Sequence, residues 1–460
     1  MKRFDFDVAV LGGGSAGYAA ARTAAGAGLK TVVIEGGREV GGLCILRGCM
    51  PTKALLYAAE VKHLAEHAET WGVRAGKVTF DFKKVMARKN AQIRDFADYR
   101  VQQLNGRKFK FIRANAGFLD AHTLEFKCCS GGRQFAPINQ SRLTSAATLT
   151  AKHFVIATGS AVAPSPLPQL DEVGFLTSDE ALALKKLPKS LIVLGGGAVA
   201  CEFAQFFARF GVKTTLIQRS EHLLKEFDTD AGIEIEKVFR REGIRVFTGT
   251  KLLGAQWVAR ASRPSGSRRQ DARATTKRVL FQRNGKTVSV SAEEILFALG
   301  RVPNTAGLDL EKAGVKTDGD RIVADEFMRT SAPHIYAAGD CTGPHEIVHI
   351  AIQQGETAAH NIVARERGRP ACGNCAPGAS NLKLAGGPPA LLCHYVARRG
   401  FALRDGDVDD FMRPGAITRR VNVRRARLHE LICHDAATLA GDPGSSQVER
   451  RRVRYAAQRE

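Results

Sequence analysis

The sequence has little of what marks membrane, secreted or disordered proteins. No uninterrupted apolar run approaches the roughly 18 residues that a transmembrane helix needs. The first ten residues include Asp5 and Asp7, where a secretory signal requires an apolar core. Only 16 prolines occur, and 25% of residues are charged, which argues against general disorder. We therefore expect a cytoplasmic protein that does not bind membranes, and the 460 residues predict two or three domains.

The ten cysteines do not indicate a disulfide framework, because cytosolic thiols stay reduced unless they are catalytic. Cys372 and Cys375 form one isolated Cys-x-x-Cys without a second ligand pair, and the vicinal Cys128 and Cys129 are interpreted as a surface-strand pair. No metal site is expected. Two further cysteines, Cys201 and Cys341, are expected to pack as small apolar groups.

The formal net charge of +22 is concentrated in two places. Residues 259–278 hold seven basic residues and one acid, and the last 90 residues hold 15 basic and nine acidic residues. We expect residues 259–278 to form a surface loop. Only 7% of residues are aromatic, and none is interleaved with the basic runs as a nucleic-acid stacking platform requires. A solvated basic surface is the favoured interpretation, and nucleic-acid binding is the weaker one.

Glycine is abundant, with 46 residues, and one cluster follows a predicted strand, Phe6–Leu11. Gly12, Gly14 and Gly17 have the spacing of a dinucleotide-binding turn, in which they permit a tight turn, close approach of a pyrophosphate and helix–strand packing. The next predicted strand, residues 31–34, is followed by Glu35, which is placed to bind a ribose diol. These residues predict a first dinucleotide site at a helix N-terminus.

A second cluster repeats the pattern after the predicted strand Ser190–Leu194. It contains Gly195, Gly197 and Ala200, and alanine is allowed at the third position. The following strand, residues 214–217, ends without an acid, and Arg219 and Lys225 follow it. Cations suit a 2′-phosphate, so NADPH is favoured over NADH, unless these two residues are simply surface cations. Two such units predict an α/β protein with two Rossmann-like, doubly wound domains.

The most informative feature is the pair Cys44 and Cys49, which are separated by four residues in the chain. A helix is predicted over residues 53–65, and thiols near a helix N-terminus and a cation such as Lys53 gain thiolate character. Cysteines at this spacing can approach disulfide distance, but spacing alone does not guarantee it. The alternative, two packed core thiols, is disfavoured by the nearby dinucleotide turn. Further elements are predicted as a helix over Phe82–Leu104 and as strands over residues 155–157, 295–299 and 334–338.

At this point residues 4–365 resemble the flavoprotein pyridine nucleotide-disulfide oxidoreductases, which include dihydrolipoamide dehydrogenase, glutathione reductase and mercuric reductase. Residues 41–53 resemble the redox-disulfide segment of this family, with Leu43 where threonine is usual. Residues 157–160, 298–304 and 335–340 resemble its other signatures. The resemblance implies two cofactors, FAD and NADPH or NADH.

The resemblance also implies residue roles. Cys44 and Cys49 would form the redox disulfide, with Cys49 beside the flavin and Cys44 attacking the substrate. Lys53 and Glu202 would form a buried pair beside the flavin. The implied FAD-binding residues are Gly12, Gly14, Gly17, Glu35, Lys53, Gly117, which precedes a turn at residues 118–121, Thr158, Gly159, Asp340 and His349. The implied NAD(P)-binding residues are Gly195, Gly197, Ala200, Arg219, Lys225 and Gly300, and Ala198 would replace a bulkier residue over the nicotinamide.

The tail departs from the family. The family ends in an interface domain that forms a homodimer and supplies a His-Glu acid/base pair, but Ala436 and Gly441 stand at those positions, with His434 two residues upstream. After residue 370, 14 arginines occur against one lysine. Either the tail has diverged, with His434 or another group transferring protons, or its reading frame is altered. Both explanations remove the basis for expecting the homodimer.

The predicted domains are an FAD-binding domain with the redox disulfide at residues 1–150, an NAD(P)-binding domain at 151–294, the second part of the FAD-binding domain at 295–365 and a divergent C-terminal interface region at 366–460. The predicted function is electron transfer from NAD(P)H through FAD and Cys44–Cys49 to a small disulfide, a dihydrolipoyl group or Hg(II). Two alternatives are an NAD(P)H oxidase or diaphorase, and a non-catalytic flavoprotein or basic nucleic-acid-binding derivative.

Overall fold

The computed structural model describes residues 3–106, 108–127, 147–259 and 275–368. The chain divides into two units, residues 1–377 and 378–460, and the second lies wholly outside the described residues. So do Cys128, Cys129, Cys372, Cys375 and His434, together with most of both basic segments. Within the described ranges, no helix combines the length and the apolar character that a membrane crossing demands.

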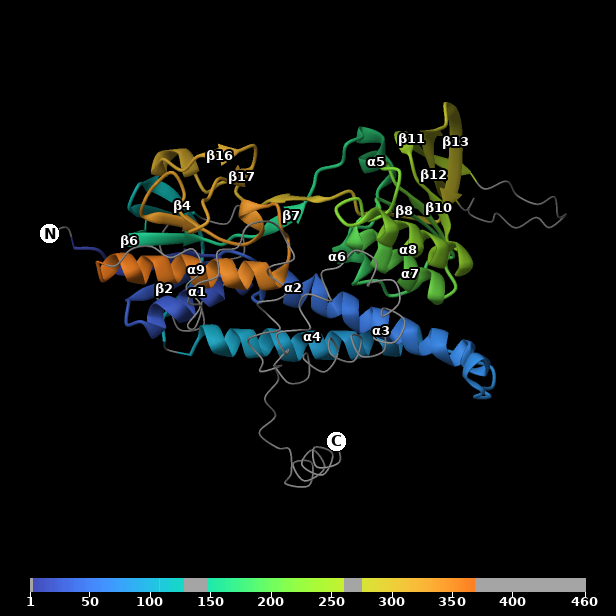
Figure 1. The fold of residues 1–460 in the computed structure, drawn as a ribbon, viewed down its shortest axis with the longest axis horizontal. Coiled ribbons are helices and arrows are strands. Elements are labelled where there is room, and N and C mark those ends of the chain that lie inside the picture. The colour runs from blue at the N-terminus through green and yellow to red at the C-terminus, as the bar shows by residue number, and fades with distance from the viewer. Residues whose placement is uncertain (1–2, 107, 128–146, 260–274, 369–460) are drawn as a thin grey trace, which may run out of the picture. The chain divides into compact units, whose positions relative to one another are not determined.

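The first sheet has the strand order β3-β2-β1-β6-β5-β4, and β18 also pairs with β6 (Figure 1). The pairs β1–β2, β2–β3, β1–β6 and β6–β18 are parallel, whereas β4–β5 and β5–β6 are antiparallel. Its strands are β1 (Phe6–Leu11), β2 (Thr31–Glu35), β3 (Lys110–Arg113), β4 (Asn115–Asp120), β5 (Thr123–Lys127), β6 (Thr148–Ile156) and β18 (Ile335–Ala337).

Alternating side chains of β1 supply two separate cores, because successive residues of a strand face opposite sides of a sheet. Val8 and Val10 pack with the alanine-rich helix α1 (Ser15–Gly26) and with α9 (Val348–Glu366). Ala9 and Leu11 pack on the other side with residues of β4, β5 and β6. The helices α1 and α9 lie side by side on one face of the sheet (Figure 1). This packing orients the N-terminus of α1 at the carboxyl end of β1.

The second sheet is parallel, with the order β10-β9-β8-β14. Its strands are β8 (Ser190–Leu194), β9 (Lys213–Ile217), β10 (Arg245–Phe247) and β14 (Glu294–Phe297). In the chain, the helix α7 (Ala198–Arg209) follows β8 and the helix α8 (Thr229–Arg241) follows β9. A separate antiparallel sheet contains β11 (Thr250–Ala259), β12 (Thr275–Arg283) and β13 (Lys286–Ala292). The parallel strands of the first sheet and the parallel second sheet confirm the α/β class with two Rossmann-like domains.

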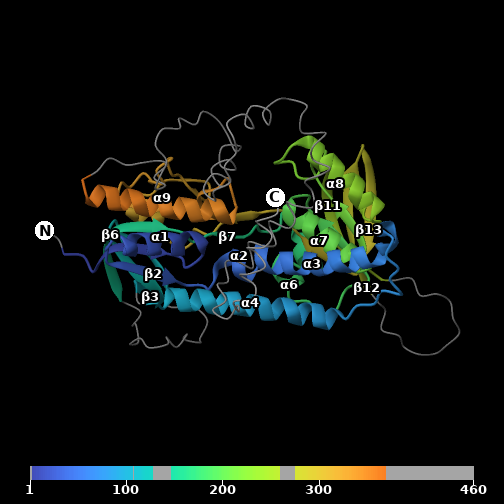
Figure 2. The same cartoon turned by 60° about the horizontal axis from the view of Figure 1, so that its bottom comes forward.

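Helices connect the two sheets. α3 (Cys49–Glu66) follows the short α2 (Gly42–Leu46), packs against α4 (Phe82–Leu104) and contacts α7 of the second sheet. Figure 2 shows α3 and α4 running side by side. The remaining elements are η1 (Ala68–Trp71), β7 (Ser160–Val162), α5 (Pro168–Val173), α6 (Ser178–Ala181), β15 (Arg301–Pro303), η2 (Leu310–Ala313), β16 (Thr317–Asp318), β17 (Arg321–Ile322) and η3 (Asp340–Thr342).

Three predicted elements, Phe6–Leu11, Phe82–Leu104 and Ser190–Leu194, have the observed bounds, but two loop predictions were wrong. The surface loop predicted for residues 259–278 is contradicted at its two ends, because Ala259 belongs to β11 and residues 275–278 to β12, which pairs with β11. Residues 260–274 lie outside the described residues. The turn predicted at residues 118–121 is also strand as far as Asp120, because β4 pairs with β5. In both cases cross-strand pairing organises residues whose local sequence lacks a clear strand period.

The strand pairing also bears on the expected domain bounds. The division after residue 150 falls inside β6, which pairs along its length with β1 of the first sheet, and the division after residue 294 falls inside β14 of the second sheet. We propose that these divisions follow Ile156 and Phe297 instead. The bound near residue 366 coincides with the end of α9 at Glu366.

Candidate active site

The first glycine cluster forms a tight turn between β1 and α1. Gly12 has φ +107°, and a Cβ atom there would lie 2.2 Å from the Ala157 carbonyl oxygen. A Cβ atom at Gly17 would lie 1.9 Å from the Gly12 carbonyl oxygen. Gly14 caps α1 without a side-chain hydrogen bond, and a Cβ atom there would meet only Gly42 Cα, at 3.6 Å. The turn therefore leaves the N–H groups of α1 open to an anion.

Glu35 closes this turn at the carboxyl end of β2. Its carboxylate accepts hydrogen bonds from the backbone N–H groups of Gly13, at 2.8 Å, and Gly37, at 2.6 Å. A carboxylate has about four acceptor positions, so it retains capacity for the hydroxyls of a ribose. The structure thus brings Glu35 to the glycine turn, as its position after the strand predicts.

Gly117 lies in β4. It pairs with Glu125 inside the β4–β5 ladder, and its open side faces Lys127 Nζ, 2.6 Å from a Cβ position. Ala114 lies beside Glu35, and its N–H donates to the Glu35 carbonyl at 3.1 Å. The FAD-binding role of Gly117 stays a prediction.

The turn after β6 carries an unsatisfied polar atom. Thr158 Oγ1 is buried and has no hydrogen-bond partner among the described residues. The adjacent Gly159 has φ +72°, and Asn304 holds the turn by donating its N–H to the Gly159 carbonyl at 2.9 Å. Buried hydroxyls in native proteins nearly always have a partner. The unpaired Thr158 hydroxyl beside the Gly12 turn therefore fits a site in which a bound cofactor supplies the missing hydrogen bond.

Asp340 lies at the start of η3, at the end of β18. Its carboxylate accepts a hydrogen bond from Ser160 Oγ at 2.7 Å, and Arg301 Nε donates to the same Ser160 Oγ at 2.8 Å. The two signature segments are therefore linked to each other and to the turn at Thr158. His349 lies in the first turn of α9, nine residues further along the chain.

The two cysteines lie on consecutive helices. Cys44 is in α2 and Cys49 is the first residue of α3, and both thiols are free and partly buried. A hydrogen bond from the Cys44 thiol lowers the pKa of Cys49 to about 7, burial opposes this effect, and the Lys53 charge adds to it. The same hydrogen bond, together with burial, raises the pKa of Cys44. Cys49 is therefore the cysteine of the pair that ionises first, near neutral pH, while Cys44 keeps its proton.

Lys53 lies one turn after Cys49 on α3, and it forms an ion pair with Glu202 of α7. The pair was expected to be buried, but the Lys53 side chain is 55% exposed and that of Glu202 is 25% exposed. The side chains of the protein by themselves therefore do not bury this ion pair, and the expectation of a buried pair was wrong. An ion pair this exposed contributes little to stability, about 0–1 kcal/mol. Its position between Cys49 and α7 still connects the dithiol to the second dinucleotide unit.

Sequence reasoning missed Arg47, which lies between the two cysteines. Its guanidinium forms ion pairs with Glu39, at 2.5 Å, and with Asp179 of α6, at 3.4 Å. These contacts hold the segment between α2 and α3 from two sides. No sequence motif indicated these ion pairs, because the packing of the folded chain brings Glu39 and Asp179 to Arg47.

The second glycine cluster repeats the geometry of the first. Gly195 has φ +114°, and a Cβ atom there would lie 2.2 Å from the Ala298 carbonyl oxygen. Gly197 caps α7 with no side-chain hydrogen bond and open space around its Cα, and Ala200 is buried. Gly300, with φ +137°, follows β14 and accepts a hydrogen bond from Ala163 at 3.1 Å. The turn can therefore hold a second pyrophosphate.

The two turns differ at the end of the second strand. Gln218 is buried there, and its Oε1 accepts a hydrogen bond from the Arg219 N–H at 3.0 Å. Arg219 is exposed, whereas Lys225 forms an ion pair with Glu226 at 3.0 Å. Gln218 thus occupies in the second turn the place that Glu35 occupies in the first. Its amide is neutral, and the next residue, Arg219, forms no ion pair with the described residues.

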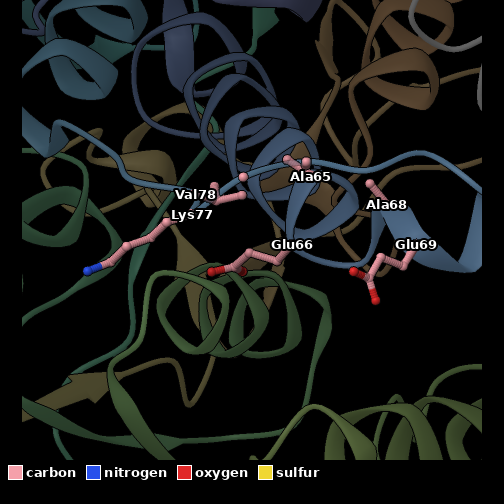
Figure 3. Close-up of a pocket in the computed structure, with 8 residues that line it drawn as sticks. Ala65, Glu66, Ala68, Glu69, Lys77 and Val78 are labelled. Atoms are coloured by element: carbon pink, nitrogen blue, oxygen red, sulfur yellow. The ribbon is translucent and has the colours of Figure 1, made fainter.

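One surface hollow lies away from these groups, at the far end of α3 (Figure 3). Ala65, Glu66, Ala68 and Glu69 line it together with residues 75–78, and Glu66 already pairs with Lys62 at 2.6 Å. It contains none of the predicted site residues.

Two phosphate-binding turns with a dithiol between them define an oxidoreductase that carries two dinucleotides. A family model described as pyridine nucleotide-disulphide oxidoreductase matches residues 6–355, and the chain belongs to this family. Enzymes of the family use FAD and NAD(P)H, and the residues described above fit both groups. This confirms the predicted family and cofactors.

Curated relatives include dihydrolipoyl dehydrogenases and mercuric reductases. A dihydrolipoyl dehydrogenase of Bacillus subtilis (strain 168) is 33% identical over 364 residues, which is 78% of this chain and 72% of the relative. A mercuric reductase of Streptomyces lividans is 35% identical over 367 residues, 78% of this chain and 70% of the relative. A mercuric reductase of Bacillus cereus is 33% identical over 363 residues, and there the matched part is 52% of the relative. The chain thus spans only about half the length of that last protein.

Proposed function

We propose that the protein is an NADPH-dependent flavoprotein that reduces small disulfides through Cys44 and Cys49. The observation that carries this proposal is the placement of two free, partly buried thiols on the consecutive helices α2 and α3, where the interaction with Cys44 lowers the pKa of Cys49 to about 7. FAD, when bound, supplies the two-electron link between NADPH and this pair. A hydride delivers two electrons and one proton, which matches a product with one thiol and one thiolate.

The same interaction gives the dithiol its own proton path. As Cys44 attacks a substrate sulfur, its proton passes to Cys49, the substrate S–S bond breaks and a Cys44–substrate disulfide forms. The leaving thiolate takes the proton from Cys49. Cys49 then attacks Cys44 Sγ, the Cys44–Cys49 disulfide forms and the second product leaves as a thiolate that gains a proton from water. Each turnover consumes one NADPH, one proton and one disulfide, and yields two thiols.

This path needs no His-Glu pair, so it accommodates Ala436 and Gly441 at the positions where the family has its base. The Cys49 pKa of about 7 suits a group that must take and return a proton at neutral pH. Hg(II), the substrate in the name of some relatives, also binds thiolate pairs. We favour a disulfide because the proton relay supports exchange chemistry, which Hg(II) reduction does not require.

The NADPH preference rests on Gln218 and Arg219. A buried amide does not offer a ribose diol the paired acceptors of a carboxylate, and an exposed guanidinium suits a 2′-phosphate. Lys225 contributes less, because Glu226 already neutralises it. The cytoplasmic location and the absence of nucleic-acid binding stay predictions, as does the question of a homodimer.

An anaerobic absorbance titration of the purified protein with NADPH tests the proposal. A long-wavelength thiolate-to-flavin band at two electrons is expected in wild type, and C49S should lose it. C44S keeps a hydroxyl that can donate to Cys49, so it should keep part of that band at pH 7 and more of it at higher pH, yet lose disulfide reduction. Quinone reduction should survive in both variants. Flavin that bleaches without the band in wild type contradicts the proposal and leaves a diaphorase.

A further inference from the structure

One partly buried cation, Arg100, has two covered nitrogen atoms without a hydrogen bond to the described residues. Arg100 lies on α4, and its Nε and Nη1 atoms are buried without a hydrogen bond to any of the residues described. Its guanidinium carbon lies 4.3 Å from the centre of the Tyr18 ring on α1, so it stacks on that ring. Burial lowers the pKa of Arg100, but a guanidinium stays charged at neutral pH.

The surroundings of Arg100 do not neutralise it. The groups that act most on its charge are Tyr18, Cys44, Arg22 and Tyr99, and none of them is a carboxylate. Arg22 is itself a cation, and it is already paired with Glu356 of α9. Covered polar atoms and unpaired buried charges are costly, by several kcal/mol for an ion. A site of this kind is stable when an anion binds to it.

The position of Arg100 relates it to the reacting thiol. The helix α2, which carries Cys44, packs against α4. The hydrogen bond to Cys49 and burial raise the pKa of Cys44, and the charge of Arg100 acts against them. The guanidinium is therefore within electrostatic reach of the sulfur that attacks the substrate.

We propose that Arg100, held against Tyr18, is the residue that recognises a carboxylate on the substrate that reacts at Cys44. This inference rests on the proposed function, and it narrows the substrate to small disulfides that bear a carboxylate. An Arg–carboxylate pair can form two parallel hydrogen bonds, through Nη2 and one neighbouring nitrogen, and the carboxylate would supply the counter-charge that the guanidinium lacks among the described residues. Arg100 is then a specificity residue and has no part in electron transfer.

The first test needs neither cofactor nor turnover. Iodoacetate and iodoacetamide both alkylate Cys44, whose proton passes to Cys49 as it attacks, and they differ only in a carboxylate against an amide. The reduced full-length chain is treated with each, and alkylation of the Cys44 peptide is followed by mass spectrometry. We expect the iodoacetate-to-iodoacetamide rate ratio, normalised to glutathione, to fall about tenfold or more in R100L, since a charged hydrogen bond is worth about that factor.

Two further variants separate charge from folding. R100K should keep part of the preference, because it keeps the charge but loses the fork. R94L removes an exposed arginine from the same helix and should leave the ratio unchanged. An equal ratio in wild type, R100L and R94L would overturn the inference. So would loss of bound FAD in R100L, because Arg100 would then contact the cofactor.

Turnover supplies the second test. Lipoate and lipoamide form a matched pair of disulfides, one with a carboxylate and one with an amide. Wild type should show the higher kcat/KM with lipoate, and R100L should lose about tenfold or more with lipoate while lipoamide changes little. If neither compound is reduced and no thiolate-to-flavin band forms, the proposed function fails, whereas the alkylation ratio still reports on Arg100. Equal reduction of both by every variant leaves the proposed function standing and overturns the role of Arg100.

Discussion

The Cys44 thiol is the group on which the Cys49 thiolate chiefly depends, and replacing it tests this directly. The hydrogen bond from Cys44 is the largest cause that lowers the pKa of Cys49 from its ordinary value of 9.0 to about 7. At pH 7 a thiol with a pKa of about 7 is roughly half ionised, whereas one with a pKa of 9 is only about 1% ionised. C44A should therefore raise the midpoint of Cys49 by at least about one pH unit and lower its thiolate population at pH 7 several-fold.

The assay is a pH titration of ultraviolet thiolate absorbance in the reduced protein, taken as the difference from the C49S variant. The difference isolates Cys49 from the other thiols, and the buried Cys201 and Cys341 stay protonated because burial raises their pKa to about 12 and about 11. Because the pKa is lowered, the thiolate is present above pH 7 and disappears as the pH falls through that value. An unchanged midpoint in C44A would refute the reasoning. If K53M shifted it instead, the charge of Lys53 would be the dominant cause.

Three further predictions follow from the geometry. G12A should lose FAD and about 2 kcal/mol or more of stability, because its Cβ would collide with the Ala157 carbonyl, and the control G26A should not, since a Cβ there meets nothing within 4 Å; cofactor content and Tm report both, and equal loss in the two variants contradicts it. R219A should raise the Kd of NADPH about tenfold and change that of NADH less than about twofold, as measured by fluorescence titration, because only NADPH carries the 2′-phosphate; equal weakening of both would exclude its role. R209L removes a side chain that is only 10% exposed and forms ion pairs with Glu60 and Glu242. Urea unfolding should show a loss of about 3 kcal/mol in the free energy of unfolding. A loss below about 1 kcal/mol would show that water solvates the two carboxylates in the variant and would contradict this prediction.

Local sequence patterns could predict the parts of the fold that repeat a known unit. The strands that begin at Phe6 and Ser190 precede glycines whose spacing is required by the tight backbone turn after each strand. The position of Glu35 beside the first turn was predictable because it lies at the end of a strand. The helix Phe82–Leu104 was predictable from its apolar period. The hairpin of β11 and β12 was not, because its strands are defined by their pairing across residues 260–274 and not by a local period.

The candidate site divides in the same way. By itself, the sequence determined the two phosphate turns, the cysteine pair and the missing acid after residues 214–217, because each depends on neighbours along the chain. Only the tertiary structure decided that Cys44 lowers the pKa of Cys49, that the Ala114 N–H donates to the Glu35 carbonyl, and that two nitrogens of Arg100 are covered without a hydrogen bond to the described residues. These facts depend on which helices and strands pack together. Burial and hydrogen bonding between residues distant in the chain are properties of that packing, and no local spacing encodes them.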